Sequence, residues 1–418
     1  ANASLGILDS SDAEAIIKVC DEIIDDPYRC SELTTGTLHI DGLAYNQAFN
    51  RLLAAKSGVL EEKINAGQGY EDVFNTAQNL VVYRAINLTR SGVDNLLQKL
   101  RNKAVEFRNE MHIARSHLQE SLPVSWGAVF GAMYIRLKRS ADELQRIQDL
   151  FLSVNLGLTP IDSFTHSAPG FNALAVNNLR KVTGLPLHSV SQADDPVLGS
   201  SYVEALEGDD RFIRLSSALR LIALNLARLG NDFYIYSSGP RCGISELSLP
   251  AIAPGSTIMP GKINPTVAEL IMHLCDKVFS NAAGLNIGVH SGWLGSDSHS
   301  SLPLKCMLDS CTLLSDGCEV FKRKVISGLT ANKERSAEHA RMSLALQMLL
   351  SQIVGEDKAR EVARYAYDND LTLEDAYAKL EGKAAPDSLE ATLFNVEAIS
   401  NKEGASEFME RLSRKPAV

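Results

Sequence analysis

A short segment, residues 255–266, combines the residue types needed for acid–base chemistry beside a carboxylate. Ser256 supplies a hydroxyl, Lys262 supplies a full positive charge, and two glycines allow the backbone to move and to approach a ligand closely. Asn264 before Pro265 predicts a helix N-cap followed by proline at the first helical position. Free backbone N–H groups at such a helix start favour an anion. The segment therefore predicts a carboxylate-binding loop that carries a mobile serine.

Three stretches of the chain resemble segments of one known family. Residues 255–265 read Gly-Ser-Thr-Ile-Met-Pro-Gly-Lys-Ile-Asn-Pro, which resembles the signature loop of the fumarase/aspartase superfamily. Residues 238–250 resemble the corresponding stretch of class II fumarases. Residues 115–120, Arg-Ser-His-Leu-Gln-Glu, are similar to the family's Arg-Thr-His-Leu-Gln-Asp segment. The resemblance runs from about Leu5 to about Leu380.

This resemblance implies a reversible anti-elimination across C2–C3 of a succinate-type acid, without a metal or organic cofactor. Proton removal beside a carboxylate gives an aci-carboxylate, and each well-placed donor to such an anion is worth roughly 10²–10³ in rate. The resemblance implies that Ser256 is the base and that His117 is the second catalytic residue. The substrate-binding residues that it implies are Lys262, Asn264, Ser116, Asn79, Thr37, Thr257 and Gln78.

One segment departs from the family pattern. Fumarases and aspartases carry Ser-Ser-Asn-Asp or Ser-Thr-Asn-Asp where this chain has Ala77, Gln78, Asn79 and Leu80. The asparagine is retained, but both hydroxyls and the aspartate are replaced. Gln78 is suited to a differently shaped acidic substrate, or it marks a chain that has lost catalysis.

Three functions remain open on these residues. A hydratase that converts malate to fumarate and water is favoured, because fumarases carry histidine at position 117, where several aspartases carry glutamine. Gly261 points the same way, since aspartases often have alanine there. The alternatives are an ammonia-lyase acting on aspartate or a β-substituted analogue, and a catalytically silent relative with a binding or structural role.

Hydrophobic periodicity predicts an all-α fold. Long helices are expected at 76–113, 125–150, 210–236, 265–285 and 302–325, with His117 near a turn between the first two. Shorter helices are expected at 10–23, 332–350, 356–368 and 373–380. Long helices with few breakers pack as a bundle.

The resemblance implies three domains, at 1–74, 75–331 and 332–418, the second of which holds the signature loop 255–265. It also implies a central five-helix bundle that forms the twenty-helix core of a homotetramer with shared active sites.

The composition excludes some classes of partner. The net charge of −10 argues against nucleic acid, whose binders present a basic face. No apolar run approaches the roughly 18 residues that a membrane span needs. The seven cysteines are odd in number and lack metal-ligand spacing, which favours free thiols in a reducing compartment. We therefore expect a protein of the cytoplasm, or of the mitochondrial matrix if a transit peptide has been removed, acting on a small dicarboxylate.

Overall fold

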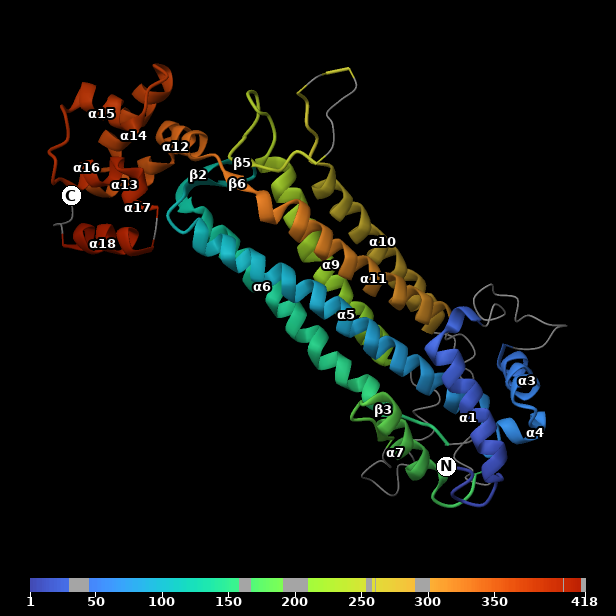
Figure 1. The fold of residues 1–418 in the computed structure, drawn as a ribbon. Coiled ribbons are helices and arrows are strands. Elements are labelled where there is room, and N and C mark those ends of the chain that lie inside the picture. The colour runs from blue at the N-terminus through green and yellow to red at the C-terminus, as the bar shows by residue number, and fades with distance from the viewer. Residues whose placement is uncertain are drawn as a thin grey trace. The chain divides into compact units, whose positions relative to one another are not determined.

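The computed structural model confirms an all-α fold (Figure 1). It describes residues 1–29, 45–157, 167–190, 210–252, 258–259, 261–289, 301–400 and 402–414. The predicted site residues Thr37, Ser256 and Thr257 lie outside these ranges. Within them, no helix combines the length and the apolar character that crossing a bilayer demands.

All five long helices that the periodicity predicts are present. They are α5 (Tyr70–Glu106), α6 (Trp126–Gln148), α9 (Asp210–Tyr236), α10 (Thr266–Val289) and α11 (Ser301–Lys324). The apolar residues of α9 recur at three- and four-residue spacing, and those on the predicted face are at most 1% exposed: Phe212, Leu215, Leu219, Ile222, Leu226 and Leu229. Burial of this stripe is what holds the helix in place.

The chain divides into two compact units. Unit 1 comprises Ala1–Leu88, Leu144–Ala218 and Ser280–Cys311, and unit 2 comprises Thr89–Glu143, Leu219–Phe279 and Thr312–Val418. The division falls inside each of the five long helices. The three-domain boundaries drawn from the resemblance stay a prediction.

Unit 1 adds short elements to its helical segments. These are α1 (Ser10–Asp25), η1 (Pro27–Arg29), α3 (Tyr45–Ser57), α4 (Glu61–Ile64), η2 (Asp149–Leu152) and α7 (Phe171–Thr183). Strand β3 (Ser153–Val154) pairs in parallel with β4 (His188–Ser189). A small core of Val154, Val176 and Leu187 lies beneath this pair, with Leu80 of α5 packed against it.

Unit 2 contains a β-hairpin and the C-terminal helices. Strand β1 (Met111–Ser116) pairs antiparallel with β2 (Gln119–Ser125), and β5 (Leu247–Ser248) pairs with β6 (Thr330–Ala331). After η4 (Ile326–Gly328) come α12 (Lys333–Met342), η5 (Leu344–Leu346), α13 (Gln347–Val354), α14 (Glu356–Asp368), α15 (Leu373–Leu380), α16 (Leu389–Phe394), α17 (Val396–Ile399) and α18 (Lys402–Ser413).

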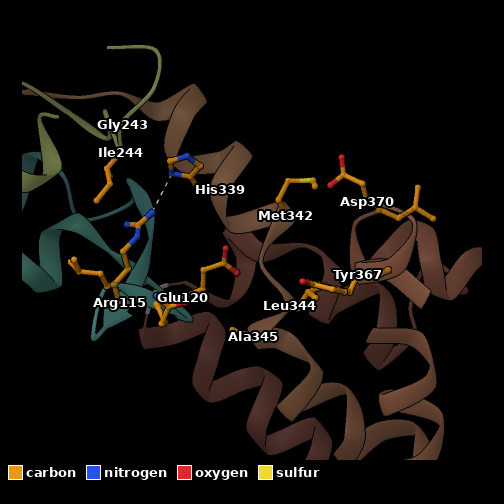
Figure 2. Close-up of a pocket in the computed structure, with 14 residues that line it drawn as sticks. Arg115, Glu120, Gly243, Ile244, His339, Met342, Leu344, Ala345, Tyr367 and Asp370 are labelled. Atoms are coloured by element: carbon orange, nitrogen blue, oxygen red, sulfur yellow. Dashed lines mark hydrogen bonds between the residues drawn. The ribbon is translucent and has the colours of Figure 1, made fainter. Parts of the chain in front are cut away.

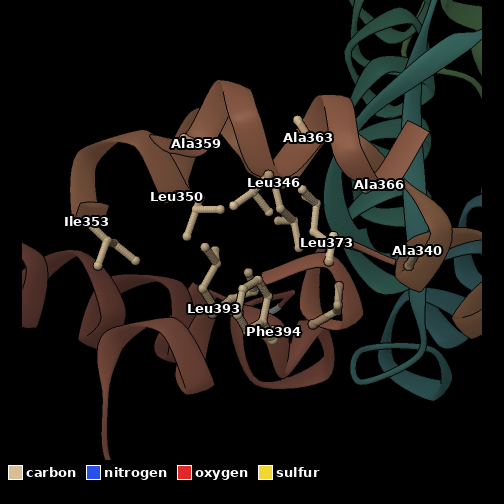
Figure 3. Close-up of a cluster of buried hydrophobic side chains, with 14 of the residues drawn as sticks. Ala340, Leu346, Leu350, Ile353, Ala359, Ala363, Ala366, Leu373, Leu393 and Phe394 are labelled. Carbon is tan, nitrogen blue, oxygen red and sulfur yellow. The ribbon is translucent and has the colours of Figure 1, made fainter. Parts of the chain in front are cut away.

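The C-terminal helices share one hydrophobic core, and β1 contributes to it. Figure 3 shows Leu350 and Ile353 of α13 facing Leu393 and Phe394 of α16. Met111 and Ile113 of β1 belong to the same cluster. The base of the hairpin is therefore fixed by side-chain packing in unit 2.

Two predicted helices are wrong in extent. The helix expected to reach Ile113 ends at Glu106, and residues 111–125, where a turn was expected, form the hairpin. Met111 and Ile113 alternate with His112, a strand pattern that is too short to distinguish from a helical stripe by periodicity. The helix expected at 332–350 breaks at Ser343, whose extended backbone lets its hydroxyl accept from Ala345 N–H at 3.2 Å.

Candidate active site

The predicted site residues lie on both units of the chain. Ser116 and His117 are at the tip of the β1–β2 hairpin, and Lys262 and Asn264 precede α10, all in unit 2 and all exposed. Gln78 and Asn79 lie on α5 in unit 1 and are buried.

The hairpin tip, residues Ser116–Gln119, has a strained backbone. Ser116 pairs with Gln119, so the loop consists of His117 at φ 55° and Leu118 at φ 61°. Two-residue hairpin loops with positive φ at both positions normally contain Asn or Gly. Left-handed backbone costs other residues roughly 1–2 kcal/mol each. A tight turn of this kind presents the imidazole of His117 to solvent, where a ligand can reach it.

Four charged or titratable side chains meet directly behind this tip. We call Glu246, Arg115, His112 and His339 the Glu246 cluster. Glu246 is fully buried, and its Oε1 accepts from Arg115 Nη2 at 2.6 Å and from His339 Nδ1 at 2.6 Å. Its Oε2 lies 3.1 Å from His112 Nδ1. One carboxylate thus joins strand β1, helix α12 and the segment before β5.

The hydrogen bonds of the cluster set its charges. Burial on its own raises the pKa of Glu246, but hydrogen bonds from His112, Arg115 and His339 outweigh it and bring the pKa to about 2. Burial lowers the pKa of His112 despite the nearby carboxylate. Glu246 is therefore ionised at neutral pH, and Arg115 balances its charge.

A cavity of about 770 Å³ adjoins the Glu246 cluster. In Figure 2, Arg115 and Glu120 lie on one side of it, and Met342, Tyr367 and Asp370 lie on the other. Residues Leu118–Glu120, which follow His117, also line it, as does His339. The cavity therefore adjoins the hairpin tip and is lined by both charged and apolar side chains.

The structure identifies three residues here that the sequence did not single out: Glu246, His112 and His339. Glu246 is part of the 238–250 stretch that resembles class II fumarases, which is the only signal that pointed to it. Its side-chain partners are 93 to 134 positions away in the chain, so no local pattern connects them.

The described part of the signature loop contains Lys262 and Asn264. Gly261 has φ 86°, a backbone conformation that suits glycine, and Lys262 N–H donates to Met259 O at 3.2 Å. The carbonyl of Pro265 accepts the first helical bond, from Glu269 N–H at 3.2 Å. Pro265 is thus the N-cap, and α10 begins at Thr266, one residue later than predicted. Asn264 instead accepts from Thr266 N–H through its backbone carbonyl at 2.9 Å.

The divergent segment of α5 is packed inside unit 1. Asn79 donates from Nδ2 to the Ser153 carbonyl at 2.8 Å. Gln78 is 2% exposed, and neither of its amide atoms finds a hydrogen-bond partner among the described residues. Within the described part of the chain, the Nδ2 atom of Asn155 is also buried without a partner. Thr76 donates to the Oδ1 atom of the same residue at 3.4 Å. Buried amides without hydrogen bonds are costly and rare in folded proteins, so the amide of Gln78 is an unusual feature of α5.

Over the described ranges, no three His, Cys, Asp or Glu side chains are grouped in a way that would hold an ion. None of the six described cysteines forms a disulfide.

Comparisons with known proteins give consistent relatives. A family model described as lyase matches residues 1–280. Fumarate hydratase class II of Nitrosomonas europaea is 30% identical over 393 residues, covering 91% of this chain and 83% of that protein. Aspartate ammonia-lyase of Escherichia coli (strain K12) is 28% identical over 370 residues, covering 85% of this chain and 75% of that protein.

A solved structure agrees with these relatives. The fumarate lyase:delta crystallin of Brucella melitensis matches with a TM-score of 0.85 at 26% identity, covering 96% of this chain and 87% of that one. The fold is therefore the one found in fumarate lyases. The hydratase and the ammonia-lyase are similar to this chain to nearly the same degree, so the leaving group has to be inferred from individual residues.

Proposed function

Because the chain belongs to the fumarase/aspartase superfamily of lyases, we propose that it catalyses a reversible anti-elimination across C2–C3 of a succinate-type acid. The favoured reaction is malate to fumarate plus water. The observation that carries the proposal is the intact signature sequence at 255–265 in a chain whose His117 sits on a strained, exposed turn. Strained backbone away from glycine is concentrated at functional sites.

The proposed chemistry divides among three groups of residues. Ser256 takes the proton from the carbon beside a carboxylate, and His117 acts on the leaving group. Lys262 and Asn264 hold the substrate carboxylate at the start of α10, where the helix end favours an anion. The remaining substrate contacts are assigned to Ser116, Thr37, Thr257, Asn79 and Gln78.

A carbon–oxygen lyase is favoured over a carbon–nitrogen lyase. His117 and Gly261 both support water as the leaving group, as does the 238–250 stretch. The 28% identity to an aspartate ammonia-lyase supports the alternative, in which ammonia leaves from aspartate or a β-substituted analogue.

A silent relative is the second candidate, and one observation favours it. Gln78 replaces a hydroxyl of the family pattern, and it is buried with no hydrogen-bond partner for its amide in the ranges that the structure describes. A side chain in that position reaches substrate only if the surrounding structure opens.

We propose a homotetramer with shared active sites. Ser116, His117, Lys262 and Asn264 are all exposed in a single chain, whereas an elimination site works best with water excluded. Neighbouring subunits would supply the missing walls. The three-domain division, the twenty-helix core and a location in the cytoplasm or the mitochondrial matrix belong to the same proposal.

The experiment is an ultraviolet assay of the fumarate double bond. Purified protein is given malate, aspartate, and fumarate with and without ammonium. Double-bond formation from malate supports the hydratase, whereas formation only from aspartate supports the ammonia-lyase. A folded oligomer that is silent on all four contradicts both assignments.

A further inference from the structure

We propose that Glu246 is a positioning residue that holds the hairpin tip, and with it His117, in its working conformation. The inference rests on the proposed function insofar as His117 takes part in catalysis. The structural half of the proposal, that Glu246 fixes the tip, stands on the geometry of unit 2 alone.

The hairpin tip needs support from outside its own ladder. His117 and Leu118 both have positive φ, and such strain persists only where the surrounding structure enforces it. The register between β1 and β2 shifts between Ile113 and Arg115. This irregularity interrupts the ladder just before the tip, so packing at Met111 and Ile113 does not by itself fix the last residues of β1.

Arg115 provides the missing link. It directly precedes Ser116 and His117, and its side chain is only 10% exposed. Its Nη2 donates to Glu246 Oε1 at 2.6 Å, while its Nη1 donates back to the Ile113 carbonyl at 3.3 Å. The guanidinium thus bridges the irregularity from one side and anchors the strand to a buried carboxylate on the other.

Glu246 is itself held at both its backbone and its side chain. Its N–H donates to the Tyr236 carbonyl at the end of α9 at 3.0 Å, and its carbonyl accepts from Asn332 N–H at 2.9 Å. His112 and His339 take up the remaining positions around the carboxylate. An anchor fixed from four directions can hold a strained turn.

The geometry calls for a carboxylate at position 246. Both carboxylate oxygens of Glu246 face nitrogen atoms of its partners. A glutamine at this position can keep an oxygen toward Arg115 and His339, but its N–H₂ group then faces His112 Nδ1. Glu246→Gln therefore keeps the shape and the bonds to Arg115 and His339, and it removes the negative charge that fixes the guanidinium. Charge-assisted bonds of this kind are about twice as strong as neutral ones.

The test measures the tip directly, without any substrate. Hydrogen–deuterium exchange of residues 111–125 is compared between wild type, Glu246→Gln and Arg115→Lys. Glu338→Gln is the matched control. Glu338 directly precedes His339 in the chain, and the change removes only an exposed ion pair with Arg335. We expect amide exchange at 115–120 to speed up by about 10-fold or more in the first two variants and to stay unchanged in the control.

Kinetics then test the catalytic half. We expect kcat to fall by about 10- to 100-fold in Glu246→Gln, with KM changed by less than about threefold. In the double variant, Arg115→Lys should add little to the fall in kcat that Glu246→Gln causes, because the two side chains act through one ion pair.

Unchanged exchange at the tip overturns the proposal, as does an unchanged kcat in a variant whose tip exchanges faster. If wild type has no lyase activity on any substrate, the proposed function fails, and the exchange result alone decides whether Glu246 holds the hairpin. If Glu246→Gln does not fold, Arg115→Lys decides by the same two measurements.

Discussion

Arg115 donates to the fully buried carboxylate of Glu246 across 2.6 Å. Arg115 opens the 115–120 motif that contains His117, and Glu246 belongs to the 238–250 stretch that leads toward the signature loop. One ion pair therefore connects two of the three stretches on which the family resemblance rests. Breaking a buried pair on one side typically costs about 3–5 kcal/mol, because a charge is left without compensation.

The Glu246 cluster predicts loss of stability in acid. The folded pKa of Glu246 is about 2, below its ordinary 4.5, so the unfolded chain takes up the proton first. This stabilisation is present above pH 4.5 and is lost as the pH falls toward 2. His112 acts in the same direction, because burial lowers its pKa below 6.5 and the unfolded chain is protonated first. Urea unfolding over about four pH units, from pH 7 to pH 3, measures how the free energy of unfolding changes with pH.

Glu246→Gln should flatten this pH dependence below pH 4.5, while the exposed Glu338→Gln should change it much less. An identical slope in Glu246→Gln and wild type would show that other carboxylates dominate acid unfolding.

Replacing Gln78 is expected to raise stability and to lower activity. Its buried amide has no hydrogen-bond partner in the described structure, so Gln78→Met should raise the free energy of unfolding by about 1–3 kcal/mol. The neighbouring Asn79→Leu is the matched control, because it removes the bond to the Ser153 carbonyl and should lower stability. If Gln78 also contacts substrate, Gln78→Met lowers turnover as it gains stability. Equal destabilisation by both changes would indicate that the assembled protein provides Gln78 with a partner.

Replacing His117 with asparagine is expected to lower turnover while leaving the fold of the hairpin intact. Asparagine tolerates the left-handed backbone better than most residues, so His117→Asn should retain the turn at φ 55°. Loss of a positioned acid–base group lowers kcat by roughly 10²–10⁴. The exposed His188 of β4, changed to asparagine, controls for the loss of a surface imidazole. A His117→Asn enzyme with wild-type kcat would remove His117 from the mechanism.

Much of the helical fold follows from local pattern. The predicted spans of α9, α14 and α15 match the structure because each has a strong apolar stripe and a clear boundary, such as the Thr372 cap whose hydroxyl accepts from Asp375 N–H at 3.0 Å. The hairpin was missed because its register and its strained turn depend on packing against the C-terminal core and on Glu246, far away in the sequence.

The site was predictable only in part. The signature loop is predictable from its residue types and spacing, whereas His117 is predicted only through the resemblance of residues 115–120 to a family segment. The structure adds the exposed turn on which His117 lies. Burial of Gln78 could not be foreseen, since it depends on the segment around Ser153 and Asn155 that packs over α5. The Glu246 cluster is likewise a product of tertiary contacts that no local pattern encodes.

Ser256 carries the central claim, and one assay tests it most directly. Turnover of malate and of aspartate is followed by ultraviolet absorbance of fumarate in wild type, in Ser256→Ala and in Ser248→Ala. Ser248 is an exposed serine of β5, in the 238–250 stretch that precedes the signature loop. If Ser256 is the base of a lyase, wild type and Ser248→Ala form the double bond at similar rates, and Ser256→Ala is slower by about 10²–10⁴-fold while remaining folded. Equal turnover in Ser256→Ala and wild type, or its absence in wild type on every substrate tried, would contradict that assignment.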